Sequence, residues 1–262
     1  MDEQGIGIFD SGVGGLTVLQ RLRAAVPHEH LLYLGDTARY PYGTKSAEVV
    51  TRYSLRNAAF LASRDIKLLV VACNTSSAVA LPALRASLGV PVLGVIEPGA
   101  RAALRCTRSG VVGVIGTPGT IASGAYQRAL AERTGVQIHA RACPLFVPLA
   151  EEGWVEGDVP RLVARDYLAP LAQAGIDTLV LGCTHYPLLR GVVGEVLGPT
   201  VNLVDSAEAT ADEVGALLEA GTVGRGEGST LRLYVTDLPQ RMPELSTRFL
   251  GERIEAAEQV DI

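Results

Sequence analysis

Two cysteines with matching surroundings are the strongest candidates for chemistry in this sequence. Cys73 follows an apolar run at residues 68–71, and Cys183 follows another at residues 179–181. In both places a run typical of a buried strand ends in a thiol and then in small polar side chains. A thiol is useful at neutral pH because its ordinary pKa is about 8.5 and the N-terminus of a helix lowers that value. Each thiol precedes an expected helix, so the sequence predicts a thiolate-forming group in each half.

Three chemistries compete for these thiols. A zinc site usually has four ligands, and Cys183 with His185 and the distant Cys73 supplies three at most. Acyl transfer would use Cys183 and His185 as a nucleophile and base, and it would leave Cys73 without a role. Proton transfer would use both thiols, because one removes a proton from one face of a carbon and the other returns a proton to the opposite face. The duplication favours proton transfer without a metal, whereas Cys106 and Cys143 lack this setting and are interpreted as structural.

The elements that must position these groups alternate between strands and helices. Strands are expected near residues 5–9, 31–34, 68–71, 92–96, 110–116, 136–141, 178–181, 201–204 and 230–235, and helices near residues 16–25, 46–63, 76–88, 120–131, 158–174, 206–220 and from 238 onward. This alternation is typical of parallel sheets in doubly wound α/β layers. Ligands of such sheets bind beyond the carboxyl ends of the strands. Asp10, Ser11, Cys73, Thr117 and Cys183 all follow expected strands, so they are predicted to converge.

The two halves of the chain repeat one pattern at a nearly constant offset. Thr117 echoes Asp10, Cys183 echoes Cys73, and Asp205 echoes Glu97, each about 107 to 110 positions later. This repetition predicts two pseudo-symmetric α/β domains with the active site in the cleft between them. The first domain is expected to comprise residues 1–97 and 207–262, and the second residues 98–206.

Composition excludes several classes of protein. The formal net charge of −5 over 262 residues provides no basic surface for nucleic acid. No secretory leader is recognised and the apolar runs are too short to span a bilayer, so no membrane partner is expected. Four cysteines in such a chain favour reduced thiols in the cytoplasm. The glycine-rich turn at residues 12–15 is a weak dinucleotide fingerprint, because Thr17 replaces its third glycine and the carboxylate of Asp10 disfavours phosphate.

Several stretches, in this order, resemble the glutamate racemase family. They are Gly7 to Gly15, Tyr33 to Thr37, Pro41 to Gly43, Ala72 to Thr75, Gly116-Thr117 with Thr120, Pro144 to Gly153, and Leu181 to Pro187. The pairing of Cys-Asn-Thr with Gly-Cys-Thr-His is highly specific, whereas the last fifty residues match more loosely. The resemblance covers residues 7 to about 210.

The resemblance implies a cofactor-independent cytoplasmic homodimer that interconverts L- and D-glutamate for peptidoglycan synthesis. It implies that Cys183 serves the L-enantiomer and Cys73 the D-enantiomer as acid and base. Asp10 and His185 are implied to assist them, with Glu152 as a further helper. The substrate-binding residues implied by the motifs are Asp10, Ser11, Tyr42, Gly43, Asn74, Thr75, Thr117, Thr184 and His185.

Other interpretations of these residues and of the chain stay open at this point. Asn74, Thr75, Thr117 and Thr184 could be ordinary helix N-caps, Asp10 and His185 could be structural polar groups, and Tyr42-Gly43 could be only a turn. The chain could racemise aspartate or another amino acid, act as a Cys/His amidase, or bind an amino acid as a regulator. The duplicated thiols favour a racemase over the amidase and the regulator.

Overall fold

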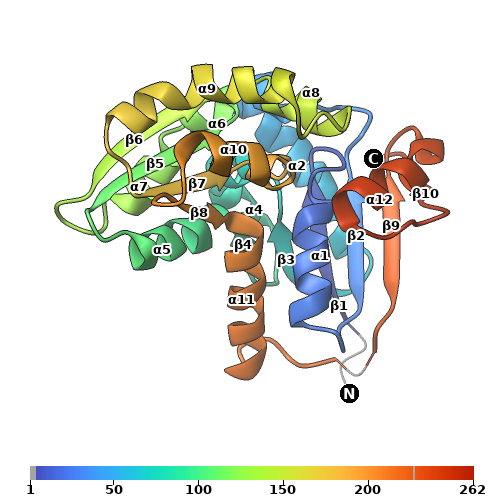
Figure 1. Ribbon diagram of the computed structural model, residues 1–262. Coiled ribbons are helices and arrows are strands. Elements are labelled where there is room, and N and C mark those ends of the chain that lie inside the picture. The colour runs from blue at the N-terminus through green and yellow to red at the C-terminus, as the bar shows by residue number, and fades with distance from the viewer. Residues whose placement is uncertain (1–3, 227) are drawn as a thin grey trace.

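The computed structural model describes residues 4–226 and 228–262 and arranges them around two separate sheets (Figure 1). The first sheet has six strands in the order β10 (Glu258–Gln259), β9 (Leu231–Val235), β2 (Leu31–Gly35), β1 (Gly5–Asp10), β3 (Ile66–Val71) and β4 (Val92–Gly94). The second has four strands in the order β6 (Gln137–Ala142), β5 (Val111–Gly116), β7 (Thr178–Gly182) and β8 (Asn202–Asp205). Neighbouring strands run parallel in both sheets, which confirms the predicted α/β class with mainly parallel sheets.

Helices connect the strands and cover the sheets. Around the first sheet lie α1 (Leu16–Ala25), α2 (Ala47–Ala62), α3 (Asn74–Val79), α4 (Leu81–Ser87), α11 (Ser206–Glu219) and α12 (Met242–Leu250). Around the second lie α5 (Ile96–Cys106), α6 (Pro118–Ala122), α7 (Ala125–Leu130), α8 (Phe146–Glu151), α9 (Asp158–Gln173) and α10 (Arg190–Leu197). Three short 3₁₀ helices are η1 (Tyr42–Thr44), η2 (Tyr186–Leu189) and η3 (Pro239–Arg241).

The strands that carry the two thiols are apolar throughout because both of their faces are buried. In β3, Leu68 and Val70 join a core with α1, α11 and α12, whereas Leu69 faces a second core with α2 and α4. In β7, Leu179 packs with α9 and α10, and Val180 packs with α5 and α7. Each thiol strand is therefore held from both sides, which fixes the position of its carboxyl end.

Several local features differ from the expected elements, and two of the differences have a clear local cause. The strand expected at residues 92–96 is shorter, because α5 begins at Ile96 and includes Glu97 in its first turn. A carboxylate is favoured there by the positive end of the helix dipole. The helix expected at residues 76–88 is divided into α3 and α4, with Pro82 in the first turn of α4. Proline has no N–H for a hydrogen bond in a helix interior but is tolerated in a first turn.

The C-terminal segment adds strands to the first sheet. β9 pairs with β2 from Leu231 to Val235, and β10, which the sequence did not predict, pairs with β9. α12 packs on α1, and α11 contacts both α1 and α5, so α11 borders both sheets (Figure 1). The division into domains at residues 97 and 207 stays a prediction.

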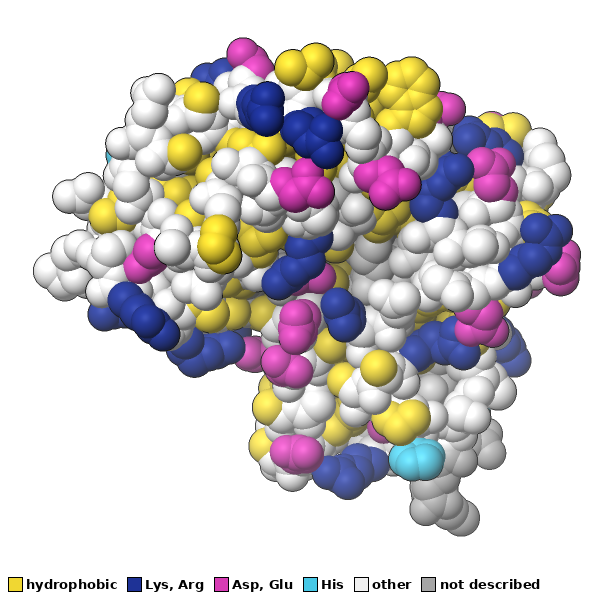
Figure 2. Space-filling model, viewed as in Figure 1, with side chains coloured by type: hydrophobic (Ala, Val, Ile, Leu, Met, Phe, Trp, Pro, Cys, Tyr) yellow, Lys and Arg dark blue, Asp and Glu magenta, His cyan; other side chains and the backbone are white. Residues whose placement is uncertain are grey.

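The surface shows mixed charge. On the face drawn in Figure 2, Lys and Arg side chains are interspersed with Asp and Glu, and exposed apolar side chains gather near the top, over α8 and α9. Within the described residues, no helix is both long enough and apolar enough to cross a membrane.

Candidate active site

The carboxyl ends of β1, β3, β5 and β7 meet at one cleft, with a cavity of about 290 Å³. This volume is near the lower end of the ~300–1,000 Å³ range of small-molecule sites. Ten of the predicted site residues line it: Ser11, Tyr42, Gly43, Cys73, Asn74, Thr75, Thr117, Cys183, Thr184 and His185. The other lining residues are Tyr40, Pro41, Thr44, Pro118, Pro144, Val147, Pro148 and Glu151. Residues from both sheets thus surround one small cavity.

Cys73 occupies the N-cap position of α3, directly beyond β3. Its side chain is buried, and burial together with the negative charge of Asp10 raises the pKa of the thiol to about 11. The hydroxyls of Ser11 and Ser76 and the Ser76 amide oppose this rise. The expectation of a readily formed thiolate is therefore wrong for Cys73 in the free protein, because burial outweighs the helix N-terminus. Cys73 is held as a thiol that can donate a proton.

Cys183 lies beyond β7 and has a histidine and a carboxylate behind it. The Nδ1 atom of His185 is 3.8 Å from the sulfur of Cys183, and its Nε2 atom is 3.1 Å from Oε1 of Glu151. Burial lowers the pKa of His185, but the hydrogen bonds and charges of Cys183 and Glu151 outweigh it and raise that pKa to about 10. The imidazole thus links the thiol to a carboxylate and can exchange a proton with the sulfur.

Glu151, rather than the predicted Glu152, is the glutamate at this site. Burial raises the pKa of Glu151, but the hydrogen bond and charge of His185, a hydrogen bond with Tyr40 and the charge of Arg241 lower it overall. Arg248 also donates a hydrogen bond to the backbone carbonyl of Glu151. Glu152 instead borders a separate apolar hollow beside the exposed Trp154 and does not line the cleft.

The two glutamates stand at the end of α8, a helix that the sequence pattern did not predict. Successive residues at the end of a helix point about 100° apart around its axis. Glu151 and Glu152 therefore face different surroundings, and a sequence without the helix cannot decide between them. Tyr40, which no motif indicated as a site residue, stacks its ring on His185 with centroids 6.2 Å apart.

Asp10 is fully buried just behind the cleft. Its Oδ2 atom accepts a hydrogen bond of 3.0 Å from the Gly12 amide, and its Oδ1 accepts one of 3.5 Å from the Thr184 hydroxyl. Burial raises the pKa of Asp10, although the charge of His185 and three backbone amides oppose the rise. Asp10 thereby connects the β1 loop to the loop that carries Cys183.

The threonines near the cleft join the two halves. Thr75 lies 3.0 Å from the Thr117 hydroxyl and 3.1 Å from the Thr120 hydroxyl, oxygen to oxygen. Thr117 is the N-cap of α6, where its hydroxyl accepts from the Thr120 amide, so it has both a structural role and a place in the cleft lining. The Thr17 hydroxyl donates to the Thr184 carbonyl across the same boundary.

Tyr42 and Asn74 are buried polar residues in the cleft wall. The Tyr42 hydroxyl donates to Asp36 and accepts from Asn57, so it is already hydrogen-bonded, and Tyr42 and Gly43 form part of η1. The Oδ1 atom of Asn74 accepts a 2.7 Å hydrogen bond from Tyr126. Tyr42 therefore does more than form a turn, and Asn74 is not the N-cap of α3, because both side chains hydrogen-bond to other buried side chains.

No ion site accompanies this arrangement. Within residues 4–226 and 228–262, no three His, Cys, Asp or Glu side chains are grouped so that they could hold a metal ion. Among the described residues that line the cleft, none is Lys or Arg. Carboxylates in the cleft would thus be held without a Lys or Arg side chain.

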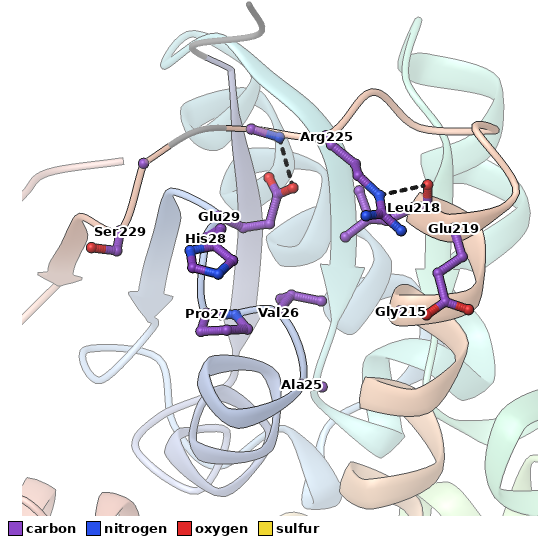
Figure 3. A pocket seen from close by; sticks show the side chains of 12 residues that line it. Ala25, Val26, Pro27, His28, Glu29, Gly215, Leu218, Glu219, Arg225 and Ser229 are labelled. Carbon is purple, nitrogen blue, oxygen red and sulfur yellow. Dashed lines mark hydrogen bonds between the residues drawn. The ribbon is translucent and has the colours of Figure 1, made fainter.

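A second, larger cavity of about 580 Å³ lies at the opposite end of the first sheet, beside the start of β2 (Figure 3). Glu29 accepts a hydrogen bond there from the Gly226 amide, and Arg225 donates to the Leu218 carbonyl. Glu29 also forms a 2.6 Å ion pair with Lys67, and both side chains are 4% exposed. Neither thiol lines this cavity, so the larger volume does not mark the reactive site.

Comparison with known families agrees with this geometry. The model of the family described as Asp/Glu/Hydantoin racemase matches residues 6–214, which include both thiols and the whole second sheet, whereas β9 and β10 of the first sheet lie beyond the match. The chain belongs to this family. The resemblance seen in the sequence motifs is confirmed at this level.

Members of the racemase family are similar to this chain over nearly its whole length. A glutamate racemase of Geobacter metallireducens is 57% identical over 265 residues, which cover 100% of this chain and 98% of that protein. The crystal structure of a glutamate racemase isoform from Bacillus anthracis superimposes with a TM-score of 0.92 at 38% identity, covering 100% of this chain and 99% of the other. A glutamate racemase from Francisella tularensis, solved in complex with D-glutamate, has a TM-score of 0.92 at 35% identity, covering 100% and 98%. The racemase fold therefore accounts for the whole chain, including its C-terminal segment.

Proposed function

We propose that this protein is a glutamate racemase in which Cys73 and Cys183 transfer protons on opposite faces of the α-carbon. The observation that carries the proposal is that two thiols, one from each sheet, line one small cleft. A single nucleophile or base would not require the second thiol. The names of the similar proteins support glutamate as the substrate.

In the L-to-D direction, the Cys183 sulfur takes the α-proton of L-glutamate and leaves a carbanion at the α-carbon. The Cys73 thiol then donates its proton to the opposite face, which yields D-glutamate and a Cys73 thiolate. The raised pKa of Cys73 supports its role as the acid in this direction. In the D-to-L direction the two thiols exchange roles, as microscopic reversibility requires.

His185 and Glu151 assist on the Cys183 side, because the imidazole can accept or return a proton at the sulfur while the carboxylate stabilises its charge. Asp10 assists on the Cys73 side through its negative charge and its bonds to the surrounding loops. The neutral donors of Ser11, Asn74, Thr75 and Thr184 are proposed to hold the substrate carboxylates. The role expected for Glu152 passes to Glu151.

The same proposal includes the biological setting. D-glutamate would supply peptidoglycan synthesis, the protein would act in the cytoplasm as a homodimer, and no cofactor would be required. Free thiols at Cys73, Cys106, Cys143 and Cys183 support a reducing compartment. We also infer two lobes, residues 1–97 with 207–262 and residues 98–206, a division supported by the pairing of β9 with β2.

The test is incubation of L-glutamate in heavy water with protein free of pyridoxal and metal. We expect optical rotation to decay to zero and one deuterium to enter at the α-carbon, with EDTA causing no loss. Absence of racemisation would refute the proposal. L-Aspartate, assayed in parallel, is expected to react far more slowly, and faster turnover of aspartate would assign the alternative substrate.

A cysteine amidase is the second candidate, because Cys183, His185 and Glu151 form a thiol–imidazole–carboxylate series. Release of ammonia from glutamine, without racemisation of glutamate, would favour it.

A further inference from the structure

We propose that Tyr126 is a positioning residue that turns the Asn74 amide so that its NH₂ group, and not its oxygen, faces the substrate. This inference rests on the proposed function, because it names the residue that prepares one carboxylate-binding donor. Tyr126 was not among the residues that the sequence pointed to.

The hydrogen bonds of the two side chains assign the orientation. Tyr126 donates its hydroxyl proton to Oδ1 of Asn74 over 2.7 Å. This bond uses the amide oxygen as the acceptor, so the NH₂ group of Asn74 points away from Tyr126. A rotated Asn74 amide would present its NH₂ group to the phenol and remove the acceptor of the phenol proton.

The NH₂ group at the other end of the Asn74 amide is available to bind a ligand. The Nδ2 atom of Asn74 is buried and has no hydrogen-bond partner among the described residues, and Asn74 lines the cleft directly after Cys73. Buried amide donors in folded proteins are nearly always satisfied. The cleft lining contains neither Lys nor Arg, so a substrate carboxylate bound there must accept hydrogen bonds from other donors. The NH₂ group of Asn74 is such a donor, and a charged acceptor makes the stronger hydrogen bond.

The fold leaves room for this tyrosine. Its ring is fully buried on α7, on the side of the second sheet, whereas Asn74 begins α3 beside the first sheet. A Cβ atom at Gly182 would lie 2.9 Å from Cε2 of Tyr126, and one at Gly99 would lie 3.3 Å from its hydroxyl oxygen. The hydrogen bond between Tyr126 and Asn74 therefore links a proposed substrate-binding side chain beside the first sheet to a helix beside the second sheet.

The test is a double-mutant cycle of Tyr126→Phe and Asn74→Ala in the full-length protein. Tyr126→Phe is expected to raise KM for both enantiomers about tenfold, the size of one hydrogen bond to a charged group, with kcat changed less than about threefold. Asn74→Ala is expected to raise KM at least as much. Adding Tyr126→Phe to Asn74→Ala should then change KM less than about twofold, because the amide that Tyr126 orients is gone.

Tyr186→Phe is the matched control, since its buried hydroxyl donates to a backbone carbonyl, that of Cys143, over 2.8 Å. It is expected to leave KM within about twofold while lowering the melting temperature as Tyr126→Phe does. An unchanged KM in Tyr126→Phe, or the same increase with and without Asn74, would overturn the inference.

A binding measurement separates this inference from the proposed function. Glutarate carries both carboxylates but no stereocentre, so its calorimetric Kd does not depend on turnover. Tyr126→Phe is expected to weaken glutarate binding about tenfold. Equal affinity in the variant, or no binding by the unmodified protein, would contradict the positioning role. Loss of racemisation by the unmodified protein would instead contradict the proposed function.

Discussion

Replacing Glu151 by glutamine removes the carboxylate that faces His185 and keeps the size and an acceptor oxygen of the side chain. The Nε2–Oε1 distance is 3.1 Å, and the two side chains are 3% and 23% exposed, so solvent screens this pair weakly. A hydrogen bond to a charged group contributes about 1.5–3 kcal/mol. Since each pKa unit corresponds to about 1.36 kcal/mol, the His185 pKa should fall by about one to two units.

The assay is titration of the ¹⁵N-labelled imidazole by NMR, with His185→Asn used to assign the signal. The His185 pKa of about 10 should fall to about 8 to 9 in Glu151→Gln. Glu152→Gln is the matched control, because Glu152 lies outside the cleft, and it should leave the titration unchanged. A shift below about 0.3 unit in Glu151→Gln, or equal shifts in both variants, would refute the assignment of Glu151.

The same perturbation affects stability in a defined pH window. The folded-state pKa of His185 is raised above its ordinary 6.5, so its contribution to stability is full below pH 6.5 and is lost as pH rises through about 10. The free energy of unfolding of Glu151→Gln should therefore be about 2 kcal/mol lower than that of the unmodified protein up to about pH 8. The difference should vanish between about pH 8.5 and pH 10. Urea titrations at these pH values measure it.

Three further predictions follow from contacts in and around the cleft. Cys73→Ser and Cys183→Ser should each retain less than about a tenth of racemase turnover, which corresponds to a barrier higher by more than ~1.4 kcal/mol. If a variant keeps more turnover than this, the thiol that it replaces is not a required base. Gly14→Ala should lower kcat strongly, because its Cβ would lie 2.4 Å from atoms of His185 and Thr184. Gly191→Ala is the control and should leave kcat unchanged, because nothing lies within 4 Å of its added Cβ. Glu29→Gln should cost about 3 kcal/mol in urea unfolding, since it breaks an ion pair with both side chains 4% exposed, and a cost under ~1 kcal/mol would contradict this.

Much of the scaffold could be predicted because it depends on local patterns. The apolar run before Cys183 ends where β7 ends, and the glycine-rich turn after Asp10 leads into α1 as expected. Parallel strands then bring their carboxyl ends together by geometry alone. The convergence of both thiols on one cleft thus needed no knowledge of side-chain packing.

The missed features depend on long-range contacts or on burial. Glu151 could not be distinguished from Glu152 without the phase of α8, and Tyr126 contacts Asn74 from 52 positions away. The protonation state of Cys73 is governed by burial and by Asp10, which outweigh the helix N-terminus that the sequence emphasised. Residues 207–262 were expected to join the first domain, but the choice of β2 as the partner of β9 joins residues 200 positions apart, and no local pattern specifies that partner.

The most direct test of the central claim is one-way elimination from each enantiomer of a glutamate analogue that carries a leaving group at the β-carbon. Elimination requires only removal of the α-proton, so it reports which thiol acts on each face. We expect Cys183→Ser to lose elimination from the L-analogue and to retain it from the D-analogue, while Cys73→Ser shows the opposite pattern. Loss of L-elimination in Cys73→Ser with survival in Cys183→Ser would reverse the assignment, and equal rates in both variants for both enantiomers would contradict the two-thiol mechanism.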